Sequence, residues 1–188
     1  ATTKKSEDFS KEEQGQIRKA TLLSLLPGGG QFYNKQVFKG ILFLGIFLVF
    51  LFQLFNSGFD AIYGLITLGT TPRDDHSLFL LIEGVLQLLL IFIFLVFYGV
   101  QIYDANRVAK IGIINPDKVN RSIKDILMNV YENGFPYLLT IPAYIMMIFA
   151  IIFPVVVTFL LVFTYYDFRH IPPATLIDWT GLDTFQSI

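Results

Sequence analysis

The chain has 188 residues, 54% of them hydrophobic and twenty of them phenylalanine, with a formal net charge of −1. This content exceeds what a soluble domain usually holds, and no dense basic patch supports nucleic-acid binding. Cysteine is absent, which excludes thiol chemistry and a cysteine-ligated metal.

The first segment, residues 1–36, is predicted to be cytoplasmic and interfacial. Ser10 and Glu13 have capping-box spacing, so a helix is expected to start there and to end at Pro27. The apolar residues of this helix are too few to span a bilayer and are bordered by Arg18 and Lys19. We expect the helix to lie at, or dip into, the membrane interface; a soluble helix packed on the bundle is the alternative.

A glycine-rich stretch, residues 27–36, follows this helix and reads PGGGQFYNKQ. Consecutive glycines permit positive φ and close backbone approach, and the aromatic pair suits the headgroup level. A phosphate-binding loop is a weak alternative, because neither the GxxxxGK[ST] pattern nor a preceding buried strand is present. The stretch is therefore predicted to be a flexible turn at the membrane surface.

Three long apolar runs predict an integral membrane protein with three transmembrane helices. The runs 78–103 and 135–166 each exceed the roughly 20 residues that cross about 30 Å of hydrocarbon. The run 40–55 is shorter, but Lys39 can snorkel and the stretch up to residue 64 can extend it. Residues 37–103 are thus expected to form a leading transmembrane hairpin in an all-α fold.

Basic residues are concentrated in two places, before the first run and between the second and third. The positive-inside rule then puts the N-terminus and residues 104–134 in the cytoplasm, and residues 56–77 and the C-terminal tail outside. Within residues 104–134, Asn115 and Pro116 predict the start of an amphipathic helix that ends at Gly134. Its charged face, with Lys118, Arg121, Lys124 and Asp125, is interpreted as solvated rather than as a binding surface.

Polar residues inside the spans are the candidates for a functional site. Glu83 is expected to reach the outer headgroup zone or to be protonated, with transport or proton relay as the alternative. Gln53, Gln87 and Thr158 are expected to form interhelical hydrogen bonds rather than to bind ligands. No catalytic or cofactor-binding residue is predicted, and the site residues stay unassigned.

Further predictions concern the third span and the loop before the second. Pro154 is expected to kink the third span, and Tyr165, Tyr166 and Trp179 are expected to mark the outer interface. In the loop before the second span, the sequence Asp74-Asp75-His76 could form a weak cation site, but a solvated loop is the preferred interpretation.

The C-terminal residues resemble binding-protein-dependent sugar ABC permeases. The resemblance rests on PYLLTIPA at residues 136–143, FTYYDF at 163–168 and WTGLDTF at 179–185, with Thr184 where the family usually has Asn. The glycine-rich stretch and Lys39-Gly40 are similar to the leading helices of the maltose/maltodextrin permease subunit of the MalF type. Residues 135–188 would then hold the first helix of the permease core and the start of an extracellular segment.

This resemblance implies a multi-pass subunit of a bacterial plasma membrane that imports maltodextrin-like oligosaccharides. It implies no enzyme activity in this chain, because ATP hydrolysis would reside in a cytoplasmic ATPase dimer. The other implied partners are a MalG-like second permease subunit and an extracellular sugar-binding protein. The exact sugar is left open.

The chain ends at Ile188, before the further helices and the ATPase-coupling loop of such permeases. We therefore expect it to be an N-terminal part, with the sugar-contacting and ATPase-coupling residues beyond Ile188. The rival hypothesis is a small, complete TM2-like membrane protein with a structural or interaction role, since residues 27–34 also resemble that family's glycine-aromatic turn.

Overall fold

A computed structural model of the chain describes residues 9–116, 128, 131, 140–167 and 169–183. Three helices are long and apolar enough to cross a membrane: Val37–Thr67, Ser77–Ile114 and Thr140–Leu161. The prediction of an all-α integral membrane protein with three such helices is confirmed. The first two of these helices are longer than the apolar runs 40–55 and 78–103 from which they were predicted. The amphipathic helix predicted to end at Gly134 falls almost entirely outside the described residues.

The chain divides into two compact units, residues 1–52 with 94–135 and residues 53–93 with 136–188. Helix α5, Ser77–Ile114, contributes residues to both units. The first unit also contains α1 (Lys11–Leu23), α2 (Gly29–Tyr33) and nearly all of α3 (Val37–Gln53). The second contains η1 (Leu54–Gly58), α4 (Phe59–Thr67), η3 (Ile148–Ile152) and α7 (Phe153–Leu161).

Helix α1 begins at the predicted capping box. The Glu13 N–H donates to Ser10 Oγ over 3.3 Å, and the Ser10 N–H donates to Glu13 Oε2 over 2.7 Å. The predicted end at Pro27 is wrong, because α1 ends at Leu23. Beyond it, the N–H groups of Leu25 and Leu26 bond to carbonyls three residues back, which tightens the chain before a proline that disfavours helical geometry in its predecessor.

The prediction of a flexible turn over residues 27–36 is wrong for its centre. Gly29–Tyr33 form the short helix α2, and Gly28, with φ of +88°, lies just before it. The Phe32 N–H donates to the Gly28 carbonyl oxygen over 2.9 Å, and the Asn34 N–H donates to that of Gly30 over the same distance. The stretch is therefore an ordered, hydrogen-bonded element.

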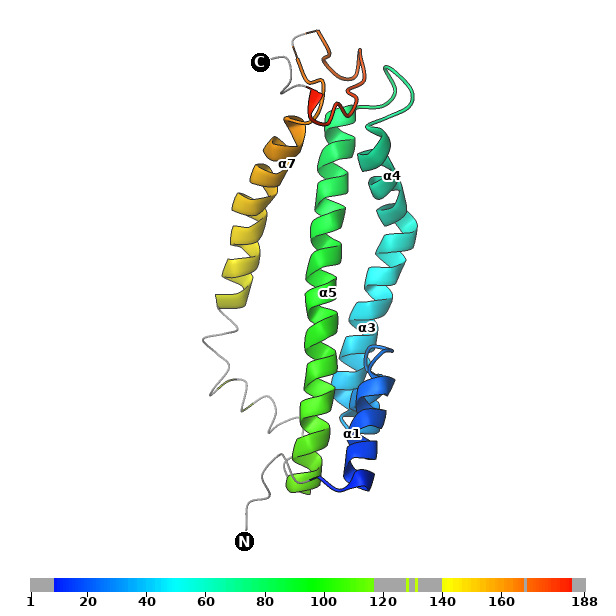
Figure 1. The fold of residues 1–188 in the computed structure, drawn as a ribbon, viewed down its shortest axis with the longest axis vertical. Helices are drawn as coiled ribbons and strands as arrows, with labels where there is room; N and C mark the ends of the chain where they lie inside the picture. The colour runs from blue at the N-terminus through cyan, green and yellow to red at the C-terminus, as the bar shows by residue number, and fades with distance from the viewer. Residues whose placement is uncertain (1–8, 117–127, 129–130, 132–139, 168, 184–188) are drawn as a thin grey trace. The chain divides into compact units, whose positions relative to one another are not determined.

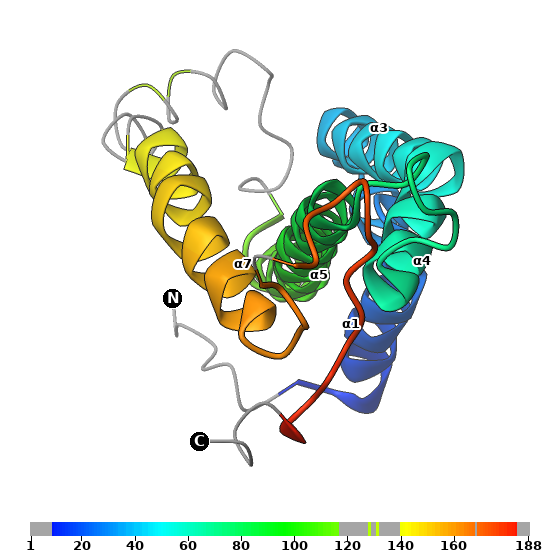
Figure 2. The ribbon, with the colours of Figure 1, turned by 90° about the horizontal axis from the view of Figure 1, so that it is seen from above.

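Aromatic side chains join α3 to the part of α5 in the same unit, and the two helices run side by side in both views (Figure 1, Figure 2). The Phe50 and Phe94 rings are stacked with centroids 3.8 Å apart, and those of Phe43 and Phe97 are tilted at 5.3 Å. The direction of these pairs makes α3 and α5 antiparallel. Ring packing of this kind supplies van der Waals contact, which holds helices together in lipid without help from the hydrophobic effect.

In the second unit, glycines bring α4 against the first half of α5. A Cβ on Gly84 would collide with the Leu65 side chain, and one on Gly64 would lie 2.9 Å from Leu80 Cδ2. Beyond this contact lies a small core of buried Leu68, Leu81, Val85 and Ile177, with residues of α7 packed against it. The close approach is typical of membrane helix pairs with small residues at the interface.

The hydrogen-bonding pattern of the third span changes next to Pro154, the residue at which a kink was predicted. A π-helical turn, η3, immediately precedes α7, in which Pro154 occupies the first turn. A proline has no N–H to donate, and a local π-helical turn is one way for a helix to accommodate that loss. Thr158 donates to the Pro154 carbonyl oxygen of its own helix over 2.8 Å, so its predicted interhelical role is wrong.

Candidate functional site

Buried and partly buried polar residues of the first unit gather along one face of α5. We call this set the polar seam: Thr21, Ser24, Gln31, Asn34, Tyr98, Gln101 and Asn106. Ser24, Gln31 and Gln101 are fully buried. Burying amides and hydroxyls is costly unless they are hydrogen-bonded, so the partners of these groups show what the seam does.

The seam binds α1 antiparallel to α5. Near the start of α1, Ile17 and Ala20 pack with Ala109, and Ile113 lies against this cluster. Further along, Asn106 Nδ2 donates to Thr21 Oγ1 over 2.8 Å.

At the end of α1 the contacts reach further toward the middle of α5. Gln101 Nε2 donates to the Ser24 carbonyl oxygen over 2.6 Å, and the Tyr98 hydroxyl donates to that of Leu25 over 2.7 Å. These carbonyls belong to the helix end, where no intrahelical N–H is available. The side chains of α5 therefore cap the C-terminal end of α1.

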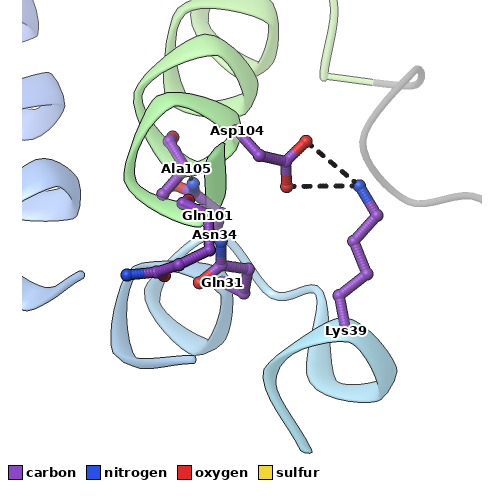
Figure 3. Close-up of polar contacts among 6 residues, drawn as sticks. All are labelled: Gln31, Asn34, Lys39, Gln101, Asp104 and Ala105. Atoms are coloured by element: carbon purple, nitrogen blue, oxygen red, sulfur yellow. Dashed lines mark hydrogen bonds and ion pairs between the residues drawn. The ribbon is translucent and has the colours of Figure 1, made fainter. Parts of the chain in front are cut away.

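After the glycines, the chain returns along α5 in the opposite direction. Gln31 Nε2 donates to the Gln101 carbonyl oxygen over 2.9 Å, and Asn34 Nδ2 donates to the Ala105 carbonyl oxygen over 2.8 Å. Figure 3 shows these side chains reaching from the N-terminal segment to α5. Residues 11–36 thus form a hairpin of α1 and α2 packed on α5, which we call the N-terminal hairpin.

An ion pair lies where the hairpin passes into α3. Lys39 Nζ is 3.3 Å from Asp104 Oδ2, and both side chains are partly buried (Figure 3). The pair joins the first turn of α3 to α5 one residue before Ala105. Because it is partly exposed, its contribution to stability is modest.

Glycines let the hairpin close. Gly28 has φ of +88°, and a Cβ there would meet the Gly40 carbonyl oxygen. A Cβ on Gly30 would meet Ser24 Oγ and lie 2.5 Å from the Ala20 carbonyl oxygen and 2.8 Å from Ala105 Cβ. These two positions require glycine for close backbone approach, which is a packing reason rather than an anion-binding one.

Two acceptors in the seam remain unpaired among the described atoms: Oε1 of Gln31 and Oε1 of Gln101 are buried and accept no hydrogen bond. Each amide nitrogen is committed to a backbone carbonyl, which fixes the orientation of the amide group. The seam consists of neutral amides and hydroxyls, most of which donate to backbone carbonyls, and it contains no ionisable acid–base pair. Its chemistry is that of a structural clasp.

The predicted interhelical hydrogen bonding of Gln53 and Gln87 is confirmed, and the structure shows that the two amides bond to each other. Gln53 Nε2 donates to Gln87 Oε1 over 2.7 Å, with a longer return contact of 3.4 Å. Gln87 is buried. Glu83, on the same helix, is exposed, and its role stays a prediction.

The Asp74-Asp75-His76 segment is an ordered loop rather than a cation cluster. Asp75 Oδ2 accepts from the N–H groups of Thr70 and Thr71 over 2.7 and 2.8 Å. These two N–H groups, Thr70 first, hold the pKa of Asp75 below its ordinary value. Within the described ranges, no three His, Asp or Glu side chains are grouped to hold a metal ion.

Residues 162–183 fold over the ends of the second unit's helices. Thr164 and Trp179 form an antiparallel bridge, and Trp179 Nε1 donates to the Leu65 carbonyl oxygen over 3.1 Å. Ile177 is buried and its N–H donates to Ser77 Oγ over 3.1 Å. Tyr165, Tyr166 and Trp179 are exposed, as interfacial residues would be, but their place at the outer interface stays a prediction.

Comparison with known proteins gives close sequence relatives. The chain is 51% identical over 173 residues to the maltodextrin transport system permease protein MdxF of Bacillus subtilis, which covers 92% of this chain and 40% of that protein. The chain is a homologue of sugar-transport permeases. The predicted resemblance to sugar ABC permeases is thereby confirmed.

Two further relatives agree with this assignment. The permease protein MalC of Streptococcus pneumoniae, also of a maltodextrin transport system, is 49% identical over 94% of this chain. GanP of Bacillus subtilis, a galactooligosaccharides transport system permease protein, is 42% identical over 90% of it. The chain spans about 40% of the length of each of these relatives. No family model and no solved structure matches this permease homologue.

The similarity does not favour the rival TM2-like hypothesis, since it extends over nearly the whole chain rather than the glycine-rich turn alone. The polar seam was not predicted from the sequence. Gln101 and Asn106 lie outside the recognised motifs, and Gln31 lies in the glycine-rich stretch but was given no role there. The partners of all three are 70 to 85 residues away along the chain. Their one sequence signal is that amides recur at the ends of apolar runs.

Proposed function

We propose that this chain is part of the membrane permease subunit of an ATP-driven importer of maltodextrin-like oligosaccharides and contributes to the wall of its translocation pathway. The observation that carries the proposal is the 49–51% identity to two maltodextrin permeases over more than nine-tenths of the chain. The galactooligosaccharide relative is less similar, which favours an α-glucan substrate over a galactoside.

The proposed partners are a second permease subunit, a cytoplasmic ATPase dimer and an extracellular sugar-binding protein. In this scheme ATP binding closes the ATPase pair and turns the permeases outward, and the docked binding protein then releases its sugar between them. The chain itself would hydrolyse nothing. Its three apolar helices supply membrane-spanning elements of that assembly.

The proposed orientation has the N-terminus in the cytoplasm of a bacterial cell. Support comes from the distribution of charge, because Lys and Arg are dense before α3 and after the uncharged part of α5 and sparse elsewhere. The Lys39–Asp104 pair would then lie toward the inner leaflet, and residues 68–76 and 162–183 toward the outside.

The experiment that tests the proposal is sugar uptake by cells. The full-length protein that carries this chain replaces the maltodextrin permease subunit of a host whose other transport components are intact. We expect uptake of labelled maltotetraose to be restored and uptake of a labelled galactotriose to stay at the level of the deletion strain. Normal membrane insertion without uptake of either sugar would overturn the proposal. Uptake of the galactotriose alone would overturn the assignment of a maltodextrin-like substrate.

A further inference from the structure

The N-terminal hairpin lies beside a part of α5 that must cross the membrane. In α5 the 20 residues between Glu83 and Asp104 carry no charge. At about 1.5 Å per helical residue they extend about 30 Å, the thickness of the hydrocarbon core. Asp104 therefore marks the membrane boundary on the side of the hairpin, and residues of α5 before it lie in lipid.

Helix α3 gives the same boundary independently. The 20 residues between Lys39 and Asp60 are likewise uncharged and helical. Lys39 and Asp104 are paired with each other at 3.3 Å, so the boundaries read from two helices coincide at one level. A charged pair at this level is consistent with the edge of the hydrocarbon rather than its interior.

The contacts of α1 can now be placed against this boundary. Ile17 lies with Ala109 and Ile113, beyond Asp104, whereas Leu25 is bonded to Tyr98, six residues before it. Six helical residues correspond to about 9 Å. Helix α1 thus passes the level of Asp104 along its length, and Leu25, two residues beyond its C-terminal end, lies about 9 Å inside.

The surface of the hairpin changes character at the same level. The charged residues of α1 are confined to its first part, up to Lys19. After them, Leu22, Leu25 and Leu26 are 64%, 61% and 57% exposed. Three large apolar side chains with this exposure would be unfavourable in water and are at home against acyl chains.

The polar groups of the hairpin meet the requirement that lipid imposes on irregular backbone. Non-helical segments are tolerated at membrane depth only where protein covers their polar groups. Pro27, Gly28 and Gly30 are buried, and the carbonyls of Ser24 and Leu25 accept bonds from Gln101 and Tyr98. Protein therefore covers the polar side of the turn, whereas its leucine side chains stay exposed.

We propose that residues 20–34 are a re-entrant segment, which enters the membrane from the side of Lys39 and leaves on the same side. Its exposed leucine face contacts the acyl chains of that leaflet. The inference concerns membrane depth and does not depend on which sugar, if any, the full protein transports.

Site-directed spin labelling tests it on the full-length protein reconstituted in phosphatidylcholine–phosphatidylglycerol vesicles. This chain contains no cysteine, so single cysteines can be placed at Leu22, Leu25 and Leu26 without other changes in it. The matched control is Arg18→Cys, which lies on α1 with Leu22 and is exposed. For each label, collision with oxygen, which concentrates in lipid, is compared with collision with a water-soluble nickel chelate.

We expect oxygen to relax the labels at positions 22, 25 and 26 more than nickel does, and the order to reverse at position 18. Nickel access at position 25 equal to that at position 18 would show an aqueous hairpin and overturn the proposal. Weak collision with both reagents at all three leucines would mean that protein covers this face, which would overturn the lipid contact. Uptake measured on the same variants separates loss of transport from loss of depth.

Discussion

Replacement of Gly30 by alanine tests whether the N-terminal hairpin is a closely packed element. The new methyl group would collide with Ser24 Oγ, just beyond α1, and would lie 2.5 Å from the Ala20 carbonyl oxygen and 2.8 Å from Ala105 Cβ on α5. The Ala20 carbonyl oxygen belongs to the backbone, and Ala105 Cβ is fixed to it, so rotation of one flexible side chain cannot relieve the collision. The hairpin must move away from α5 to accept the substitution.

Overpacking of this kind costs about 1–3 kcal/mol. The cost is expected to fall on the hairpin rather than on the three spans, because two of the three atoms nearest the new methyl group belong to Ala20 and Ser24 of the hairpin itself. Since about 1.4 kcal/mol corresponds to a tenfold change in an equilibrium constant, local opening is expected to become roughly 5 to 150 times more frequent.

Hydrogen–deuterium exchange on the full-length protein in nanodiscs measures this opening. The reporters are the N–H groups of Phe32 and Asn34, which donate to carbonyls of Gly28 and Gly30. The matched control is Gly15→Ala in α1, where no atom lies within 4 Å of the new methyl group. Alanine at that helical position is expected to be neutral or stabilising by about 0.5–1 kcal/mol.

Faster exchange at Phe32 and Asn34 in Gly30→Ala, with no acceleration in Gly15→Ala, supports the close-packed hairpin. Unchanged exchange in Gly30→Ala would refute it, because the space for a methyl group would then have to exist. Acceleration throughout α3 and α5 would also contradict the reasoning, which confines the effect to the hairpin.

Three further predictions concern other parts of the chain. A double-mutant cycle of Gln53→Leu and Gln87→Leu, followed by denaturant unfolding in micelles, should give a coupling of about 0.6 kcal/mol, as interhelical hydrogen bonds in membranes do; zero coupling would contradict the amide pair. Asp75 has a lowered pKa, so the order that it gives its loop should be present above its ordinary value of 3.8 and be lost as the pH falls through the lowered one. A spin label at Asp74 should therefore gain mobility in acid, and Asp75→Asn should abolish the change; the same acid transition in that variant would assign it to another group. In intact cells an impermeant maleimide should label a cysteine at Asp74 and spare one at Lys118, and the opposite pattern would reverse the proposed orientation.

The parts of the fold that sequence predicted were those set by composition and local chemistry. The length of uncharged runs predicts spanning helices because a bilayer leaves backbone groups no other partners. Ser10 and Glu13 predict a helix start because both partners of the capping box lie within one turn. Gln53 and Gln87 could be predicted to bond between helices because an amide inside an apolar span needs a partner, although their pairing with each other was not predicted.

Prediction failed where the partner of a residue is set by packing rather than by spacing. The Thr158 hydroxyl could donate to another helix or to its own, and the sequence does not distinguish the two. In the structure it donates to the carbonyl oxygen of Pro154, four residues back. Gly28 and Gly30 looked like a flexible turn because glycine signals both freedom and close approach. Only the positions of Gly40 and Ala105 distinguish the two meanings.

The seam explains why this chain buries neutral amides next to an apolar helix. A helix that ends near lipid leaves carbonyl groups without water, and each unpaired group costs more there than at an aqueous surface. Gln101 and Tyr98 supply donors at the end of α1, and an amide does this without bringing a charge into the membrane. The ionic contact, Lys39 with Asp104, lies one turn further out, where headgroups and water lower the cost of charge. At the depth proposed for the hairpin, neutral donors lie inside and charges outside, which is the order that the polarity gradient of a bilayer favours.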